Sequence, residues 1–240
     1  MGTTRPNAVA AGVFFLVAFA TAIAGLALYQ PALGDPAYVL GAGADGQVLL
    51  GGFLELLLAG SCIGTGVALY PVIRLYGPSV ALGYVCGRLL EAAIICVGIV
   101  ATLSLVSLRQ DAPAGDDEAL TTAARTLIAL HDWTFLLGPG LVIGVNSMLL
   151  AWLMLRSRLV PAWIARLGLG GGALGGALVL ASSTAVLFGF YAQTSAVALV
   201  AAIPVAAWEL CLAVRLIVSG FAPSLPERRP GQELPVPTLA

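Results

Sequence analysis

The chain has 240 residues, of which 60% are hydrophobic and 10% are charged, and its formal net charge at pH 7 is −1. A soluble domain carries about 25% charged residues, so this composition excludes a soluble globular protein, and it is equally unlike a disordered chain. The small net charge and the lack of a basic stripe exclude a nucleic-acid partner. The composition therefore indicates a polytopic membrane protein, for which the lipid bilayer is the first partner.

Six apolar stretches are long enough to cross a bilayer, which needs about 20 helical residues. Each is far longer than a barrel strand of about 10 residues, and none alternates with period 2. The expected fold class is therefore all-α, a six-helix transmembrane bundle over residues 1–220, followed by a proline-rich, disordered cytoplasmic tail over residues 221–240. The predicted spans are about residues 8–29, 47–70, 79–108, 119–155, 163–190 and 196–220.

The distribution of arginine predicts the orientation, because cytoplasmic loops are enriched in basic residues. Seven arginines fall in the N-terminus, in the loops after the second and fourth spans, and in the tail, which share one side of a six-span protein. The other side holds Arg109, Arg125 and most of the acidic loop residues, so we expect both termini in the cytoplasm. Tyr29 and Tyr38 are expected in an aromatic belt at the outer interface.

Five charged side chains and the only histidine fall inside the predicted spans. A charge at the centre of a span costs about 2.5–3.5 kcal/mol on insertion scales, so five of them cost on the order of 15 kcal/mol if left alone. They must be paired, neutralised or hydrated, and the most economical packing is one shared polar site that opens, if at all, toward the outer side. The set is Glu55, Arg88, Glu91, His131, Asp132 and Glu209.

Four carboxylates in this set face a single arginine, which leaves three negative charges uncompensated while His131 is neutral. Either a carboxyl group is protonated, because desolvation and like charge favour its neutral form, or a cation binds. Arg88 and Glu91 are i, i+3 neighbours and can pair on one helix face. The alternative interpretation of this pair is a purely structural contact that fixes the third span against its neighbours.

The fourth span contains Gly138, Pro139 and Gly140, and the proline predicts a helix break because it removes a backbone donor and clashes one turn back. Asp132, Pro139 and Asn146 recur every seven residues and so share a face, where freed carbonyls and polar side chains can form a ligand site. An ordinary kink is the alternative. In the fifth span, glycines at positions 168, 172 and 176 predict close helix packing.

His131 and Asp132 are the candidates for metal ligands, but as adjacent residues they point about 100° apart on a regular helix. They converge on one ligand only if the helix is irregular at this point. The alternative role for His131 is a hydrogen-bonded packing residue between helices.

Over about residues 5–221 the chain resembles the uncharacterised bacterial six-span membrane proteins grouped as domain of unknown function 4386. HDWTFLLGPG at residues 131–140 is the most specific segment. The resemblance implies a multi-pass protein of the bacterial cytoplasmic (inner) membrane, implies no activity, and places the family's characteristic polar positions at the six residues singled out above. The other segments are PNAVAAGVFFLVAF, DPAYVLGAGAD with LEL around Glu55, GYVCGRLLEA, RSRLVPAWI and PVAAWEL.

These patterns favour a protein that binds or translocates a proton, a cation or a small polar solute at an intramembrane acidic site. Glu91 and Glu209 would be the titrating pair, Arg88 would hold Glu91, and His131 and Asp132 would form the outer end of the site. One alternative is an intramembrane enzyme acting on a lipid or isoprenoid, with carboxylates and His131 as general acid and base or as metal ligands. Another is a structural or assembly protein. The sequence defines no cofactor, oligomeric state or substrate.

Overall fold

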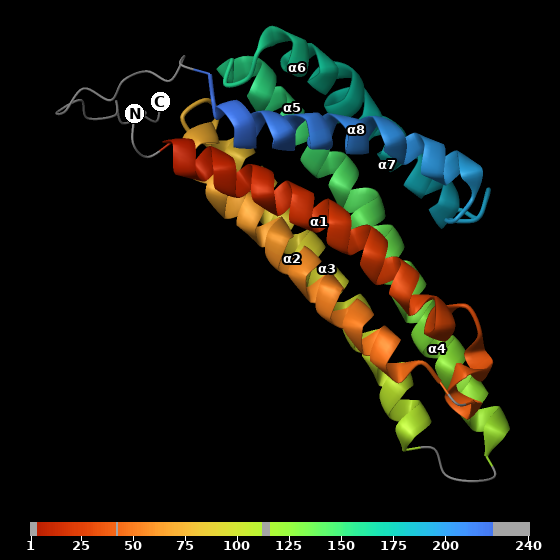
Figure 1. The fold of residues 1–240 in the computed structure, drawn as a ribbon. Coiled ribbons are helices and arrows are strands. Elements are labelled where there is room, and N and C mark those ends of the chain that lie inside the picture. The colour runs from red at the N-terminus through yellow and green to blue at the C-terminus, as the bar shows by residue number, and fades with distance from the viewer. Residues whose placement is uncertain (1–3, 42, 112–115, 223–240) are drawn as a thin grey trace, which may run out of the picture.

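The computed structural model describes residues 4–41, 43–111 and 116–222, and the elements in these ranges are all helices (Figure 1). Six helical segments are long and apolar enough to cross a membrane, which confirms the all-α, six-span fold class. Residues 223–240, most of the predicted tail, lie outside the described ranges. The six segments are α1 (Thr4–Leu33), α2 (Asp45–Ile73), α3 (Pro78–Gln110), the series α4–η2–α5 (Asp117–Ser157), the series α6–η3–α7 (Ala162–Leu187) and α8 (Ala196–Ser219).

The fourth span is irregular at the position where the sequence predicts a break, and the helix continues through it. Its parts are α4 (Asp117–Phe135), η2 (Leu136–Val142) and α5 (Ile143–Ser157), and they follow one another without a gap. Gly138, Pro139 and Gly140 lie in η2, which is a π-helical segment. A wider turn of this kind absorbs an irregular residue while the helix continues, so the proline does not end the span.

The fifth span consists of α6 (Ala162–Leu167), a second π-helical segment η3 (Gly168–Leu174) and α7 (Gly175–Leu187). The spaced glycines pack closely, as predicted, but Gly168 and Gly172 lie against the side chain of Trp208, whereas Gly171 and Gly176 lie against neighbouring backbones. A Cβ atom on Gly171 would lie 2.5 Å from the carbonyl oxygen of Pro204, and one on Gly176 would lie 2.6 Å from that of Gly144. These contacts fix the fifth span between α5 and α8.

The six spans do not form one parallel bundle. Helices α1 to α4 run side by side, whereas α8 meets α1 near the chain termini and diverges from it further along, where α7 packs against α8 (Figure 1). Near the termini α1 and α8 are in close contact, because a Cβ atom on Gly12 of α1 would lie 2.7 Å from the carbonyl oxygen of Ala213 of α8. The divergence leaves the middle of α8 separated from α1.

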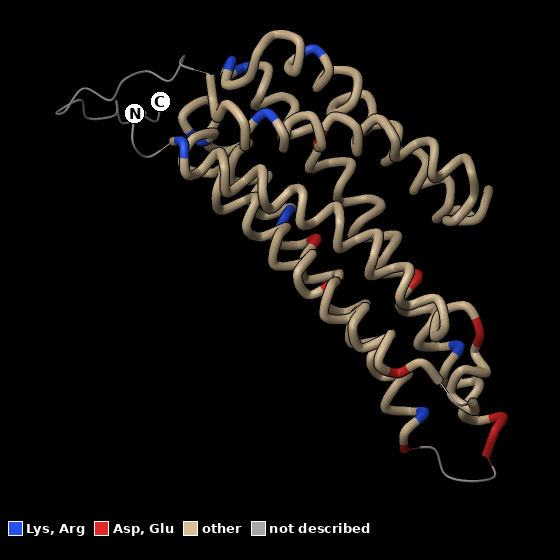
Figure 2. The backbone as a smooth tube through the Cα atoms, in the orientation of Figure 1, with Lys and Arg blue, Asp and Glu red and all other residues tan. Residues whose placement is uncertain are grey.

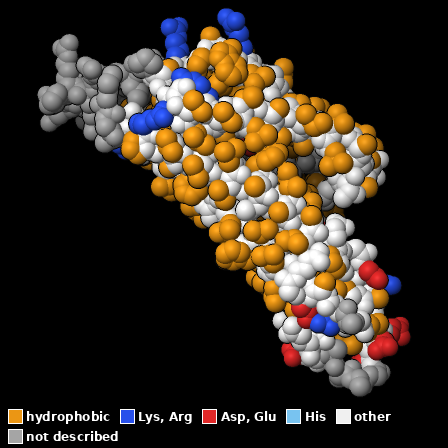
Figure 3. Space-filling model, in the orientation of Figure 1, with side chains coloured by type: hydrophobic (Ala, Val, Ile, Leu, Met, Phe, Trp, Pro, Cys, Tyr) orange, Lys and Arg blue, Asp and Glu red, His pale blue; other side chains and the backbone are white. Residues whose placement is uncertain are grey.

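The two ends of the molecule differ in charge. Arginines gather at the end that holds the termini and acidic residues gather at the other, with an apolar flank between them (Figures 2 and 3). Each end is filled by an apolar cluster. The basic-end cluster includes Phe15, Leu69 and Trp208, and the acidic-end cluster includes Tyr29 and Leu105.

At the acidic end, the short helix η1 (Pro36–Leu40) is tied to α2 and α3 through Asp45. Asp45 accepts hydrogen bonds from the hydroxyl of Tyr38 at 2.6 Å and from Nε of Arg109 at 2.7 Å. Burial, together with the bond to Asp45, raises the pKa of Tyr38 to about 12. Tyr29 is fully buried and Tyr38 is 7% exposed, so neither side chain forms part of a surface belt as predicted.

Candidate functional site

A cavity of about 320 Å³ lies between the basic-end and acidic-end clusters, where α8 has left α1. Its walls are mostly apolar side chains from α1, α2, α7 and α8. Four helices contribute charged or titratable groups to it: α2, α3, α4 and α8. The structure thereby brings together on one surface five of the residues predicted from their cost in a membrane, namely Glu55, Arg88, Glu91, His131 and Glu209.

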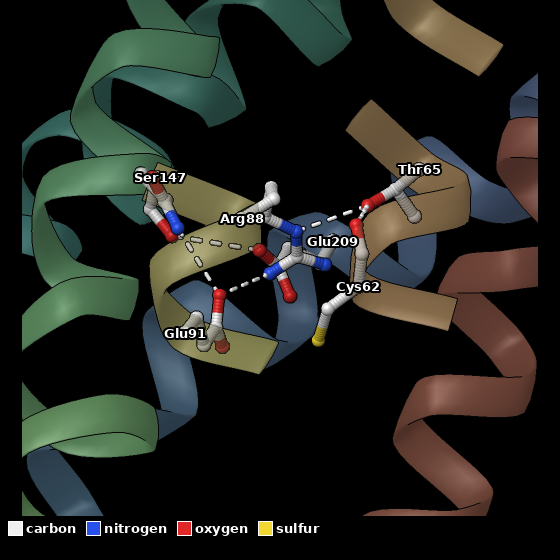
Figure 4. Close-up of polar contacts among 7 residues, drawn as sticks. Cys62, Thr65, Arg88, Glu91, Ser147 and Glu209 are labelled. Carbon is white, nitrogen blue, oxygen red and sulfur yellow. Dashed lines mark hydrogen bonds and ion pairs between the residues drawn. The ribbon is translucent and has the colours of Figure 1, made fainter. Parts of the chain in front are cut away.

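The side chains around Arg88 form a hydrogen-bonded network that includes an ion pair (Figure 4). Nη1 of Arg88 lies 2.9 Å from Oε2 of Glu91, and both side chains are 4% exposed. Nε of Arg88 donates a hydrogen bond to Thr65 at 3.0 Å, and the guanidinium lies 5.7 Å from the ring centre of Phe15. Asn146 donates a second hydrogen bond to Glu91 at 3.1 Å. The charge of Glu91 is therefore compensated within the protein.

The other two carboxylates on the cavity lack such partners. Glu209 is half-buried on α8, and within the described residues it accepts a hydrogen bond from the hydroxyl of Ser147 at 3.5 Å, the outer limit for such a bond (Figure 4). Neither Glu55 nor Glu209 forms an ion pair within the described part of the chain. Counting the pair of Arg88 and Glu91 as neutral, the cavity therefore carries two negative charges when His131 is neutral and both carboxyl groups are ionised.

Glu55 lies in a different environment from Glu209. It is 6% exposed and interacts electrostatically with His131 and Tyr29, whereas Glu209 interacts with Arg88 and Glu91. The ring of His131 makes an edge contact with Tyr29 at 5.7 Å between ring centres. Neither the hydroxyl of Tyr29 nor Nδ1 of His131 has a hydrogen-bond partner among the described residues. The buried hydroxyl of Tyr29 is thus left unsatisfied at this end of the cavity.

Asp132 does not lie in the site. Its side chain is 64% exposed and it is absent from the lining of the cavity, although its neighbour His131 lines it. The nearest approach of the two residues is 3.7 Å between Nδ1 and Oδ1, too far for a hydrogen bond. Because α4 remains regular here, the two side chains diverge as adjacent helical residues do. No group of three or more metal-ligating side chains occurs in the described ranges.

The cavity opens sideways rather than toward the acidic end. The acidic-end cluster fills the space between α1, α2, α3 and α4 on that side. Phe19 and Ile23 of α1 line the cavity and are 39% and 60% exposed, so its wall continues onto the apolar flank of the molecule. The predicted outward opening is thus replaced by an opening between α1 and α8, because α8 diverges from α1.

Several residues of the site are uncharged, so the sequence analysis, which searched for buried charges, did not identify them. Thr65, Ser147 and Tyr29 each contact a charged or titratable group of the site. Gly87 also contributes, because a Cβ atom there would lie 2.0 Å from Oδ1 of Asn146. The available signal is proximity in sequence: Gly87 precedes Arg88, and Ser147 follows Asn146.

The fold and cavity define a class of protein, a multi-pass membrane protein with an internal acidic cavity. The family model described as domain of unknown function (DUF4386) matches residues 10–220, so the chain belongs to this family. Comparison with curated proteins and with solved structures found no match. The family assignment supports an integral membrane protein and carries no activity.

Proposed function

We propose that the chain binds a proton or a cation in this cavity and passes it across the membrane. The observation that carries the proposal is the pair of uncompensated carboxylates, Glu55 and Glu209, on an otherwise apolar cavity. Two isolated charges at this depth are each costly in a membrane. A bound proton or cation neutralises the carboxylate and removes that cost, so the binding of positive charge is energetically favourable.

The residues of the cavity divide into two roles in this proposal. Glu55 and Glu209 are the binding groups because they lack partners, whereas Glu91 is held by Arg88 and Asn146 and positions α3 against α5. The titrating pair inferred from the sequence, Glu91 and Glu209, is thereby revised to Glu55 and Glu209. The apolar clusters at both ends close the cavity, so translocation requires α8 and α1 to move relative to each other.

We also propose that the basic end faces the cytoplasm of a bacterial cell. The separation of arginines from acidic residues supports this orientation (Figure 2). A green fluorescent protein fused to the C-terminus tests it, since this reporter fluoresces only when it folds in the cytoplasm. Fluorescent cells are expected, and dark cells that contain the full-length fusion contradict the orientation.

The direct test of the function is ion flux in proteoliposomes that contain the purified full chain. Internal pH and the uptake of monovalent cations are followed after a membrane potential is imposed. We expect flux that falls at least tenfold in Glu209→Gln and in Glu55→Gln. Glu118→Gln, the same change at an exposed position at the start of α4, serves as the matched control and retains flux. Flux equal to that of empty liposomes, or flux unaffected by either cavity variant, contradicts the proposal.

A further inference from the structure

We infer that the ligand of this cavity is an aliphatic diammonium ion, whose two cationic ends pair with Glu55 and Glu209 while its methylene chain lies along the apolar wall. This inference rests on the proposed function and names its substrate class. It follows from the number of uncompensated charges, their separation, and the chemistry of the surface between them.

The two carboxylates are separate binding points rather than one shared site. Glu55 lies beside the part of α1 that holds Tyr29, because a Cβ atom on Gly25 would lie 3.0 Å from Cγ of Glu55. The ring of Tyr29 contacts His131, which lies 3.7 Å from where a Cβ atom on Gly98 of α3 would stand. Glu209 lies at the level of Glu91 on α3, because Ser147 contacts Glu209 and the adjacent Asn146 bonds to Glu91. Gly98 and Glu91 are seven residues apart, which corresponds to about 10 Å along the axis of α3. A single small cation cannot contact both carboxylates at that separation.

The surface between the two carboxylates is unsuited to an inorganic ion and suited to a hydrocarbon chain. Ca²⁺ and Mg²⁺ require about six or more oxygen ligands, and the described residues offer no group of three or more metal-ligating side chains. The intervening wall is formed by Leu58, Cys62 and Ile95, together with apolar residues of α1 and α8. A methylene chain buries apolar surface against these residues and needs no further polar partner.

The end beside Glu55 has free capacity for an ammonium group. An alkylammonium carries three N–H donors. Glu55 supplies a carboxylate, and the buried hydroxyl of Tyr29 has no hydrogen-bond partner among the described residues and can accept from the ammonium group. At the other end, Glu209 and the hydroxyl of Ser147 provide acceptors.

The volume sets an upper limit to the ligand. A cavity of about 320 Å³, at about 30 Å³ for each water-sized group, has room for about ten non-hydrogen atoms. Octamethylenediamine has this size, and hexamethylenediamine and tetramethylenediamine are smaller. The opening between α1 and α8 is apolar, so longer chains within this limit are favoured over shorter ones by their apolar area.

Calorimetric titration of the full-length protein in nanodiscs of zwitterionic lipid tests the inference, with empty nanodiscs subtracted. The probes are the three diamines, hexylamine as a monocation, and hexanediol as a neutral analogue. Hexamethylenediamine or octamethylenediamine should bind at least tenfold more tightly than hexylamine, and hexanediol should not bind. Hexylamine binding as tightly as the best diamine would overturn the inference.

Variants then test which residues hold the two ends. Glu55→Gln and Glu209→Gln should each reduce diamine affinity to that of hexylamine, while Glu118→Gln leaves it unchanged. Glu209→Asp withdraws one carboxylate by one methylene group and should shift the preferred diamine to a longer one, a result that loss of folding does not produce. An unchanged diamine affinity in Glu55→Gln would overturn the assignment.

The outcomes separate the inference from the function on which it rests. If no diamine binds but ion flux still depends on Glu209, the translocation proposal stands and the diammonium ligand is rejected. If diamines bind with the expected dependence on both carboxylates but no flux is observed, the ligand stands and translocation is rejected.

Discussion

Glu91 and Glu209 lie on the same cavity, face the same arginine, and yet differ in how their charge is met. Glu91 is paired with Arg88 at 2.9 Å and accepts a hydrogen bond from Asn146, whereas Glu209 has only a 3.5 Å contact with Ser147. A charge that is costly to bury in a membrane is therefore not by itself evidence of function. A compensated charge holds helices together, and an uncompensated one is available to a ligand.

Loss of Arg88 should produce the largest effect, because it leaves Glu91 buried without its cation. Arg88→Met is expected to lower the free energy of unfolding by about 3–5 kcal/mol, as breaking a buried ion pair does. Reversible unfolding in mixed micelles measures it. The double variant Arg88→Met/Glu91→Met, which removes both charges, should recover most of the loss. A single variant as stable as the parent chain would show that Glu91 is not held by Arg88.

The position of Glu209 depends on the packing of α8 against η3. In Gly171→Ala the new methyl group would meet the carbonyl oxygen of Pro204 at 2.5 Å, and backbone cannot yield as a side chain does. We expect a loss of about 1–3 kcal/mol from overpacking. Gly170→Ala is the matched control, since a Cβ atom there meets nothing within 4 Å. Equal stability of the two variants would argue against close packing of α8 here.

The hydrogen bond from Asn146 to Glu91 depends on Gly87. Gly87→Ala would place a methyl group 2.0 Å from Oδ1 of Asn146 and displace that side chain, with an expected loss of about 1–2 kcal/mol. Gly83→Ala lies one turn away on α3, where the nearest atom is 3.7 Å distant. The control should be neutral or stabilising by up to about 1 kcal/mol through helix propensity. A stable Gly87→Ala variant would mean that Asn146 contributes little to holding Glu91.

The smallest change in stability is expected at the uncompensated carboxylate itself. Glu209→Gln removes a charge that has no ionic partner, so the free energy of unfolding should change by less than about 0.5 kcal/mol or increase. The same unfolding assay measures it. A loss comparable to that of Arg88→Met would show that Glu209 is compensated after all, and would abolish the contrast with Glu91.

The sequence was sufficient for the six spans and for most of the charged site. Long apolar runs leave little choice of fold in a bilayer, and the cost of charge singled out the five cavity residues without any structure. The same reasoning misplaced Asp132, because adjacent helical residues point in different directions and only tertiary packing determines which one faces inward. Residues such as Thr65 and Tyr29 were not predicted, because burying an uncharged side chain in a membrane has no comparable free-energy cost.

The side on which the cavity opens could not be predicted from the sequence either. An opening at the acidic end was expected because the charged groups lie in the middle and outer part of the spans. The structure fills that end with apolar side chains and opens the flank instead, since α8 meets α1 only near the termini. Helix crossing depends on glycine contacts such as Gly12 with Ala213, whose partners lie about two hundred residues apart in the chain. The π-helical segment at Pro139 is a similar case, because proline alone does not distinguish a break from a wider turn.

Infrared difference spectroscopy of the protein in lipid shows whether Glu55 and Glu209 take up positive charge. Spectra with and without hexamethylenediamine, and at two values of pH, report changes in carboxyl groups. We expect carboxyl signals that diminish in Glu55→Gln and in Glu209→Gln and persist in Asp132→Asn, whose side chain lies outside the cavity. Signals that survive in both glutamate variants, or no carboxyl signal in the parent protein under either change, would contradict this expectation.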